Sequence, residues 1–153
     1  MIDRSAVERV LAANRYLVLG TAGKDGQPWV TPVFFAPLDP NRLCWVSSPD
    51  SRHSRNIAHR AAVAITVFDS TVEVGQAEAA YFDADAAQAT PEEMDTALQS
   101  LNSRLPRDKR LSGDALQPRG PLVLYRADLR YSYVLVRGGD PDLGNAVDRT
   151  VEV

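Results

Sequence analysis

Strand-forming residues and turn residues alternate through the first third of the chain. Apolar runs rich in branched and aromatic residues, which favour strands, stand at 16–22, 27–36 and 42–47. The segments between them, at 23–26 and 37–41, contain the glycine, proline and aspartate that are typical of turns. This pattern predicts an antiparallel β-meander of three strands.

A short helix is expected before the meander. Ser5 and Glu8 have the spacing of a capping box, in which two side chains satisfy free backbone N–H groups in the first turn of a helix. Val7, Val10 and Leu11 would then form the apolar face of that helix.

Three segments follow the meander. Residues 54–60 are expected to form a helix of two turns, with Ser51 or Ser54 as its N-cap. The almost unbroken apolar run at 62–69 predicts a strand that is buried on both faces. The segment 74–87 is ambiguous, because its alanines favour a helix whereas its aromatic and spaced acidic residues favour a long strand.

The clearest helix signal lies in the second half of the chain. Thr90, Pro91 and Glu93 supply an N-cap residue, a first-turn proline and the acid of a capping box. Apolar residues then recur at helical spacing, at Met94, Ala97, Leu98 and Leu101.

The last third of the chain returns to strands. We expect a polar loop at 106–120, two strands at 121–129 and 130–137, and a loosely held tail rich in glycine and aspartate at 138–153. Six or seven strands with two or three inserted helices favour a β-barrel over an alternating βαβ sheet. The expected organisation is one domain over 1–153, with its core at 1–137.

Composition narrows the function class. The 153 residues, 44% of them hydrophobic, suffice for one compact core. The net charge of −3 argues against nucleic-acid binding, which usually needs a broad basic field. Cys44 is the only cysteine, so an internal disulfide is excluded and a reducing compartment is favoured. Because no apolar leader or membrane-spanning run occurs, we expect a cytoplasmic protein that does not bind membranes.

Several common kinds of site are absent from the sequence. Neither a phosphate-binding GxxxxGK[ST] motif nor a GxSxG nucleophile motif occurs. His53 and His59 are six residues apart, so they would lie on different faces of a helix and would not bind one metal ion. Cys44 stands inside an apolar strand, where it is expected to be a core residue and not a nucleophile.

One short segment concentrates groups that could bind an anion. In SSPDSRHSRN, at 47–56, hydroxyl groups, two guanidinium groups and a helix N-terminus occur together, and this combination suits a phosphate monoester. The groups are Ser47, Ser48, Ser51, Ser54, Arg52 and Arg55. Alternatively, the serines could be turn and cap residues and the arginines could be solvated. The position of the segment at the expected barrel rim favours a ligand site.

The order of the motifs resembles a known family. GQPWVTPVFF, LCWVSS, SRHSRN and AVAITVFD follow one another as in the pyridoxamine 5′-phosphate oxidase-like proteins, over about Ala13 to Ala87. The resemblance implies a mainly β fold, a six- to seven-stranded antiparallel split β-barrel with a few short peripheral helices. It also implies a homodimer that holds FMN at its interface, and it favours a strand for the ambiguous segment 74–87.

The resemblance also implies roles for individual residues. The backbone of the second strand would lie along the isoalloxazine ring, at Val30, Thr31, Pro32, Val33 and Phe34. Ser47, Ser48 and Ser51 would contribute hydroxyl groups at the phosphate, and Arg52 would be the phosphate-binding arginine. His53 stands where the family commonly has lysine, so its charge would depend on pH near 6.5. Gln76 would reach the flavin.

The expected function is that of an FMN-dependent oxidoreductase acting on an unidentified small molecule. Catalytic residues are not identified, and the C-terminal arginines do not have the spacing that would indicate oxidation of a vitamin B6 compound. Two alternatives stay open, an F420-dependent reductase and a non-catalytic module that binds flavin or haem. Trp29 and Trp45 could flank a flavin, although strand tryptophans are more often core or interface residues.

Overall fold

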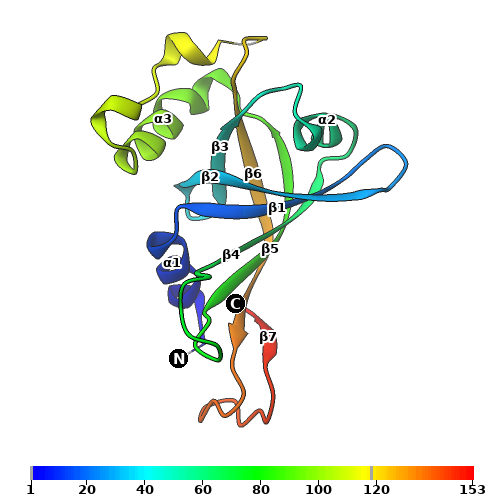
Figure 1. Cartoon of the computed structure of the whole chain (residues 1–153), viewed down its shortest axis with the longest axis vertical. Coiled ribbons are helices and arrows are strands. Elements are labelled where there is room, and N and C mark those ends of the chain that lie inside the picture. Colours follow the sequence, from blue (N-terminus) through cyan, green and yellow to red (C-terminus); the bar gives the residue numbers. More distant parts are fainter. Residues whose placement is uncertain (1, 118) are drawn as a thin grey trace.

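The computed structural model describes residues 2–117 and 119–153 and shows a β-barrel with helices at its edges (Figure 1). Residues 1 and 118, which belong to the predicted domain and to the predicted loop at 106–120, lie outside the described residues. The elements are α1 (Arg4–Ala13), β1 (Tyr16–Ala22), β2 (Pro28–Asp39), β3 (Arg42–Ser47), α2 (Arg52–His59), β4 (Ala62–Phe68), β5 (Ala79–Gln88), η1 (Pro91–Glu93), α3 (Met94–Ser103), η2 (Arg107–Lys109), η3 (Gly113–Leu116), β6 (Val123–Val136) and β7 (Arg149–Glu152).

The strands form one antiparallel sheet that closes on itself. Their order is β3-β2-β1-β4-β5-β6-β7, and an additional pairing of β3 with β6 closes the first six into a barrel. Strand β7 pairs with β6 outside this closure. The predicted fold class, a mainly β split barrel with short peripheral helices, is therefore confirmed.

The core fills the barrel interior. Alternate residues of the strands point inward, and Leu17, Phe35, Trp45 and Phe82 are among the fully buried side chains. A second, smaller cluster lies beneath α3, where Leu101 packs with buried residues of β2, β3 and β6. The helix therefore covers one side of the barrel with an apolar contact.

Strand β2 changes its partner along its length. Its first part, 28–34, pairs with β1, whereas the residues from Phe35 onward pair with β3. The prediction of a turn over 37–41 was wrong for its first residues. The strand continues to Asp39, whose carboxylate accepts a hydrogen bond from the Asn41 N–H at 2.8 Å and so closes a tighter turn.

The first helix begins differently from the expectation. Asp3, and not Ser5, is the N-cap, because its carboxylate accepts a hydrogen bond from the Ser5 N–H at 2.9 Å. The predicted cap of the second helix is confirmed at Ser51. The predicted capping box of Thr90 and Glu93 is confirmed as well, although it opens the short helix η1 immediately before α3.

Strand β4 is not buried on both faces, which corrects the expectation for 62–69. Its residues alternate between buried and exposed positions, with Val63, Ile65 and Val67 in the core and Ala64 and Phe68 outside. The apolar run therefore serves two surfaces, the core and an outer apolar face. The ambiguous segment is a loop followed by β5, so the strand interpretation is confirmed from Ala79 onward.

The C-terminal part is more regular than predicted. A single strand, β6, spans the two strands expected at 121–129 and 130–137. The tail is not loosely held, because β7 pairs with the end of β6 and buried Asn145 ties the connecting loop to the backbone. The Asn145 side-chain amide donates hydrogen bonds to the carbonyls of Arg137 at 3.0 Å and Val147 at 2.8 Å.

Candidate functional site

The serine-rich segment forms a tight turn that leads into α2. Ser51 caps the helix, since its hydroxyl oxygen accepts a hydrogen bond from the Ser54 N–H and donates one to the Ser48 carbonyl at 2.8 Å. The Ser48 hydroxyl accepts a hydrogen bond from the Asp50 N–H at 3.2 Å and is itself half-buried. Part of the serine content is therefore structural, as the alternative interpretation of this segment expected.

His53 points inward and is engaged by hydroxyl groups. Its Nε2 lies 2.8 Å from the Ser47 Oγ and 3.3 Å from the Ser51 Oγ, and only 9% of the residue is exposed. Burial lowers the pKa of the imidazole below its usual value, which favours the neutral ring at pH 7. This histidine thus supports the turn from inside and does not present a second fixed cation at the surface.

Arg52 points outward from the same turn. Its guanidinium lies over the ring of Trp29, 4.2 Å from the centroid, and the residue is exposed. Trp29 belongs to β2, so this contact places the arginine beside the first part of that strand. Arg55, one helical turn on, donates a hydrogen bond to the Asp50 carbonyl at 2.9 Å.

The strand beside Arg52 has an open edge. After the pairing of Phe35 with Trp45, β2 and β3 separate, and within the described part of the chain no strand pairs with the second edge of 28–34. Ser47 ends β3 on that side of the gap, and Ser48 follows it. The predicted residues Val30 to Phe34 therefore keep backbone N–H and C=O groups that no strand partner satisfies, beside the turn that carries Arg52.

A family profile described as pyridoxamine 5′-phosphate oxidase matches residues 4–129. The chain belongs to the pyridoxamine 5′-phosphate oxidase-like family. The match extends from α1 into β6, so it includes the turn, the open edge of β2 and the whole closure of the barrel. Among curated proteins, no sequence matches this chain.

Several solved structures share this family's barrel. A haem-binding protein from Mycobacterium smegmatis superposes with a TM-score of 0.71 at 14% identity, over 99% of this chain and 59% of that one. HutZ, a haem storage protein from Vibrio cholerae, gives 0.68 at 19% identity, over 85% and 92%. An FAD-binding protein from Mesorhizobium loti gives 0.63 at 21% identity, over 86% and 90%. At these identities the similarity shows the fold, and the chain spans about three fifths of the first of these proteins.

Gln76, for which the family resemblance implies a flavin contact, lies far from the turn in this chain. It is exposed on the loop between β4 and β5, near Val10 and Asn14. Strand β4 leads from the end of α2 to this loop, and its seven residues span roughly 20 Å. The structure therefore brings together the predicted serines, Arg52 and β2, whereas Gln76 stands at the opposite end of the strand.

The two tryptophans differ in their exposure to solvent. Trp45 is fully buried and stacks on Tyr125, with ring centroids 6.0 Å apart, so it is a core residue. Trp29 is partly exposed beside Arg52 and is the tryptophan that could contact a ligand. Cys44 is a core residue, as expected, and burial raises the pKa of its thiol to about 12.

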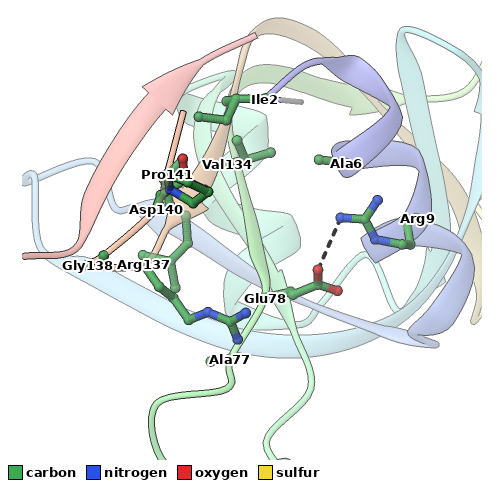
Figure 2. A pocket seen from close by; sticks show the side chains of 13 residues that line it. Ile2, Ala6, Arg9, Ala77, Glu78, Val134, Arg137, Gly138, Asp140 and Pro141 are labelled. Carbon is green, nitrogen blue, oxygen red and sulfur yellow. Dashed lines mark hydrogen bonds and ion pairs between the residues drawn. The ribbon is translucent and has the colours of Figure 1, made fainter. Parts of the chain in front are cut away.

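The surface also has hollows. One pocket of about 390 Å³ lies between α1, the residues just before β5, and the end of β6 with its following loop. The ion pair of Arg9 and Glu78, at 3.1 Å, lies across it (Figure 2). It contains none of the predicted site residues. No group of three or more metal-ligating side chains occurs within residues 2–117 and 119–153. Over the same residues, no helix is long and apolar enough to cross a membrane.

Sequence reasoning missed an apolar face on the outside of the barrel. Tyr16, Val30 and Tyr131 are 62%, 66% and 49% exposed. A shallow groove of about 250 Å³ crosses this face, lined by Val18 and Gly20 of β1, Ala64 of β4 and Tyr81 of β5 among others. The signal was present in the sequence, because runs such as YLVLGTA and AVAITVF are apolar at both strand parities.

Proposed function

We propose that this protein is an FMN-dependent oxidoreductase of the pyridoxamine 5′-phosphate oxidase-like family, acting on a small molecule that is not identified. The observation that carries the proposal is the position of Arg52 beside the open edge of β2, on a turn that also carries the Ser48 hydroxyl. A guanidinium and a hydroxyl group can donate hydrogen bonds to a phosphate monoester. The unpaired backbone N–H and C=O groups of a strand edge can bind the polar atoms at the rim of a flat ring. FMN has both parts in one molecule.

The residues present fit the cofactor. Arg52 is exposed, and its guanidinium is held by Trp29 without a carboxylate partner among the described residues. The hydroxyl proton of Ser48 is free to point outward, because its oxygen accepts the Asp50 N–H. Ser47 and Ser51 are bound to His53, so they would hold the turn in shape and not the phosphate itself.

FMN would supply the redox chemistry, and the chain would position it. Arg52 and Ser48 would bind the phosphate, the backbone of Val30 to Phe34 would orient the ring, and the apolar side chains around the groove would exclude water. The proposal assigns no acid or base to this chain.

A second copy of the chain would complete the site. The outer apolar face runs across neighbouring strands, with Val30, Tyr81 and Tyr133 lining one groove, which suits an interface between protomers. Association through this face would cover the groove. It would also allow Gln76 of one copy to approach the flavin held by the other, which one copy cannot do for its own flavin. We therefore propose a homodimer; the cytoplasmic location stays a prediction from the sequence.

The decisive experiment is a parallel titration of the purified protein with FMN and with F420. FMN binding, followed by flavin reduction with a reduced nicotinamide donor and reoxidation by an acceptor, is the expected result. Tighter binding of F420 would change the cofactor and keep the barrel site. Binding without turnover would favour the non-catalytic module; for haem, His53 is a poor axial ligand, because its Nε2 is held by Ser47. If neither cofactor binds, the proposal fails.

A further inference from the structure

A pocket under α3 has a composition that the proposed function does not use. It measures about 650 Å³ and lies between α3 with its following loop and the strands β1, β2 and β3. Its apolar wall includes Tyr16, Phe34, Val46 and Leu105. The rings of Tyr16 and Phe34 meet edge to face, with centroids 6.3 Å apart, and so form a rigid aromatic surface.

Three cations stand at this apolar pocket without an acid. Arg15, Arg104 and Lys109 line it, and no aspartate or glutamate is among its described lining residues. An apolar pocket rimmed only by positive charge is complementary to a molecule with an apolar body and a negative group.

Arg104 is the deepest of the three cations. It donates hydrogen bonds to the carbonyls of Leu11 and Asn14, both at 2.8 Å, and its guanidinium lies 4.8 Å from the Phe35 ring centroid. These partners are neutral, so the charge of Arg104 is not compensated by a carboxylate. Burial lowers the pKa of Arg104, and the charge of nearby Arg15 lowers it further. The two guanidinium groups therefore repel each other, and a bound anion would relieve this repulsion.

We propose that the pocket binds an aromatic carboxylate, a flat apolar molecule with one negative group. Its ring would pack against Tyr16 and Phe34, and its carboxylate would accept charge-assisted hydrogen bonds from Arg15 and from free N–H groups of Arg104. The volume lies within the range of about 300–1,000 Å³ that is usual for small-molecule sites.

The position of the pocket connects it to the flavin site. Phe34 is the last residue of the open edge of β2, and Val46 immediately precedes Ser47. A ring that lies along Val30 to Phe34 would therefore end beside this pocket, so the aromatic carboxylate would be a substrate. This substrate role rests on the proposed function, whereas the binding of the carboxylate does not.

The test is calorimetric titration of the whole chain with 2-naphthoate and with its neutral analogue 2-naphthamide. We expect saturable binding of naphthoate, weaker binding of the amide, and an affinity for naphthoate that falls with added salt. The variant with both Arg15→Gln and Lys109→Gln should bind naphthoate about tenfold more weakly, because it lacks two of the three cations. Arg104 is left in place, since its hydrogen bonds join α3 to α1 and β2.

The matched control carries Arg107→Gln and Arg110→Gln. These changes remove two exposed charges from the segment that carries Lys109, and neither residue lines the pocket. Its affinity for naphthoate should equal that of the unmodified chain. Equal losses in both double variants, or no saturable binding, would overturn the proposal. FMN binding measured on the same samples separates the two inferences. Naphthoate binding without FMN binding would support the carboxylate pocket and exclude the substrate role. FMN binding without naphthoate binding would overturn the carboxylate pocket and leave the proposed function intact.

Discussion

Arg52 and His53 are neighbours in sequence, yet the first turn of α2 directs them to opposite sides. Arg52 lies outside on Trp29, and His53 lies inside between Ser47 and Ser51. The two residues of this turn therefore have different roles. One offers charge to a ligand, and the other fixes the hydroxyl groups that shape the backbone.

Removing the Arg52 guanidinium tests the first role. Charge-assisted hydrogen bonds contribute about 1.5–3 kcal/mol, so Arg52→Ala should weaken FMN binding by roughly ten- to a hundredfold. Arg60→Ala is the matched control, because Arg60 is exposed beyond the other end of the same helix. Flavin fluorescence titration gives both affinities. An unchanged affinity in Arg52→Ala would exclude this arginine from the site.

The burial of His53 gives a pH dependence with a definite sign. Because burial lowers the pKa of His53 in the folded chain, the unfolded chain takes up a proton first as the pH falls below about 6.5. Folding stability should therefore be fully present above pH 6.5 and should decrease on acidification. His53→Gln should remove this part of the decrease, measured by urea unfolding between pH 8 and pH 5, whereas exposed His59→Gln should retain it.

The same geometry bears on the ligand. If His53 stays neutral, affinity for FMN should not decrease as the pH rises through 6 to 7. A decrease over that interval would mean that a protonated His53 holds the phosphate, in contrast to its buried position.

At the scale of elements, local signals were reliable where one side chain decides the structure. The Thr90 and Glu93 pair marks its helix start because both partners stand in the motif itself. Ser5 and Glu8 have a similar spacing, but Asp3 comes earlier and competes successfully for the cap. Strand ends depend on distant partners, which local propensity does not contain. β6 continues past residue 129 because β5 pairs along it, and β7 forms because the end of β6 offers a free edge.

The candidate site likewise has parts that local sequence predicts and parts that depend on distant partners. The turn, Arg52 and the strand beside it could be predicted from a contiguous order of motifs. The inward direction of His53 could not, because it depends on Ser47 from another element. The pocket under α3 also escaped prediction, since its cations stand at positions 15, 104 and 109 and meet only through the packing of α3 on the barrel.

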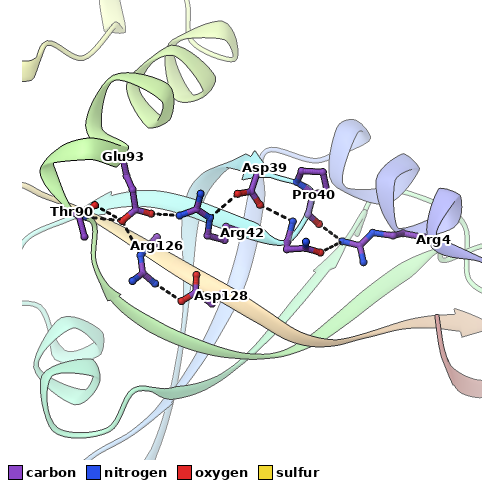
Figure 3. Close-up of polar contacts among 9 residues, drawn as sticks. Arg4, Asp39, Pro40, Arg42, Thr90, Glu93, Arg126 and Asp128 are labelled. Carbon is purple, nitrogen blue, oxygen red and sulfur yellow. Dashed lines mark hydrogen bonds and ion pairs between the residues drawn. The ribbon is translucent and has the colours of Figure 1, made fainter.

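Glu93 joins α3 to the barrel through one carboxylate (Figure 3). It contacts Arg42 of β3 at 2.5 Å and Arg126 of β6 at 2.9 Å, and it accepts the Thr90 N–H at 2.9 Å. Burial raises the pKa of Glu93, but the hydrogen bonds from Thr90 and Arg126 outweigh it, so the pKa is lowered overall. Such a carboxylate stabilises the fold above its unfolded pKa of 4.5 and loses that contribution as the pH falls.

Glu93→Gln should therefore destabilise the protein by about 1–2 kcal/mol at pH 7, and by progressively less as the pH falls below 4.5. Neighbouring Glu92→Gln is the control, because Glu92 is exposed. Denaturant unfolding at pH 7 and pH 4 provides the comparison. A loss that is equal at both pH values would show that the ionised form of Glu93 contributes nothing to the junction.

At the scale of the molecule, the barrel has an apolar interior and, over five neighbouring strands, a mostly apolar outer face that includes the carboxylate of Asp83. The outer residues belong to β2, β1, β4, β5 and β6, which are adjacent in the sheet, so they form one continuous surface. Ala64 stands near its centre, with Gly20 as its cross-strand partner on β1. A Cβ at residue 20 would approach the Ala64 carbonyl oxygen to 3.2 Å, so glycine is favoured at this point of the groove.

A charge at the centre of this surface tests the proposed homodimer. Ala64→Arg is exposed in one copy, so the barrel should still fold. Even with Asp83 as its cross-strand neighbour on β5, the interface would have to bury a long charged side chain in this groove. We expect the dissociation constant of the dimer to rise by at least about tenfold, measured by sedimentation equilibrium. Val147→Arg, which adds the same charge at an exposed apolar residue of the loop before β7, should leave the dissociation constant of the dimer unchanged.

FMN affinity should decrease together with dimerisation in Ala64→Arg, since the partner would close the site. A monomeric wild-type chain that binds FMN fully would contradict the shared site and leave the turn with Arg52 sufficient on its own.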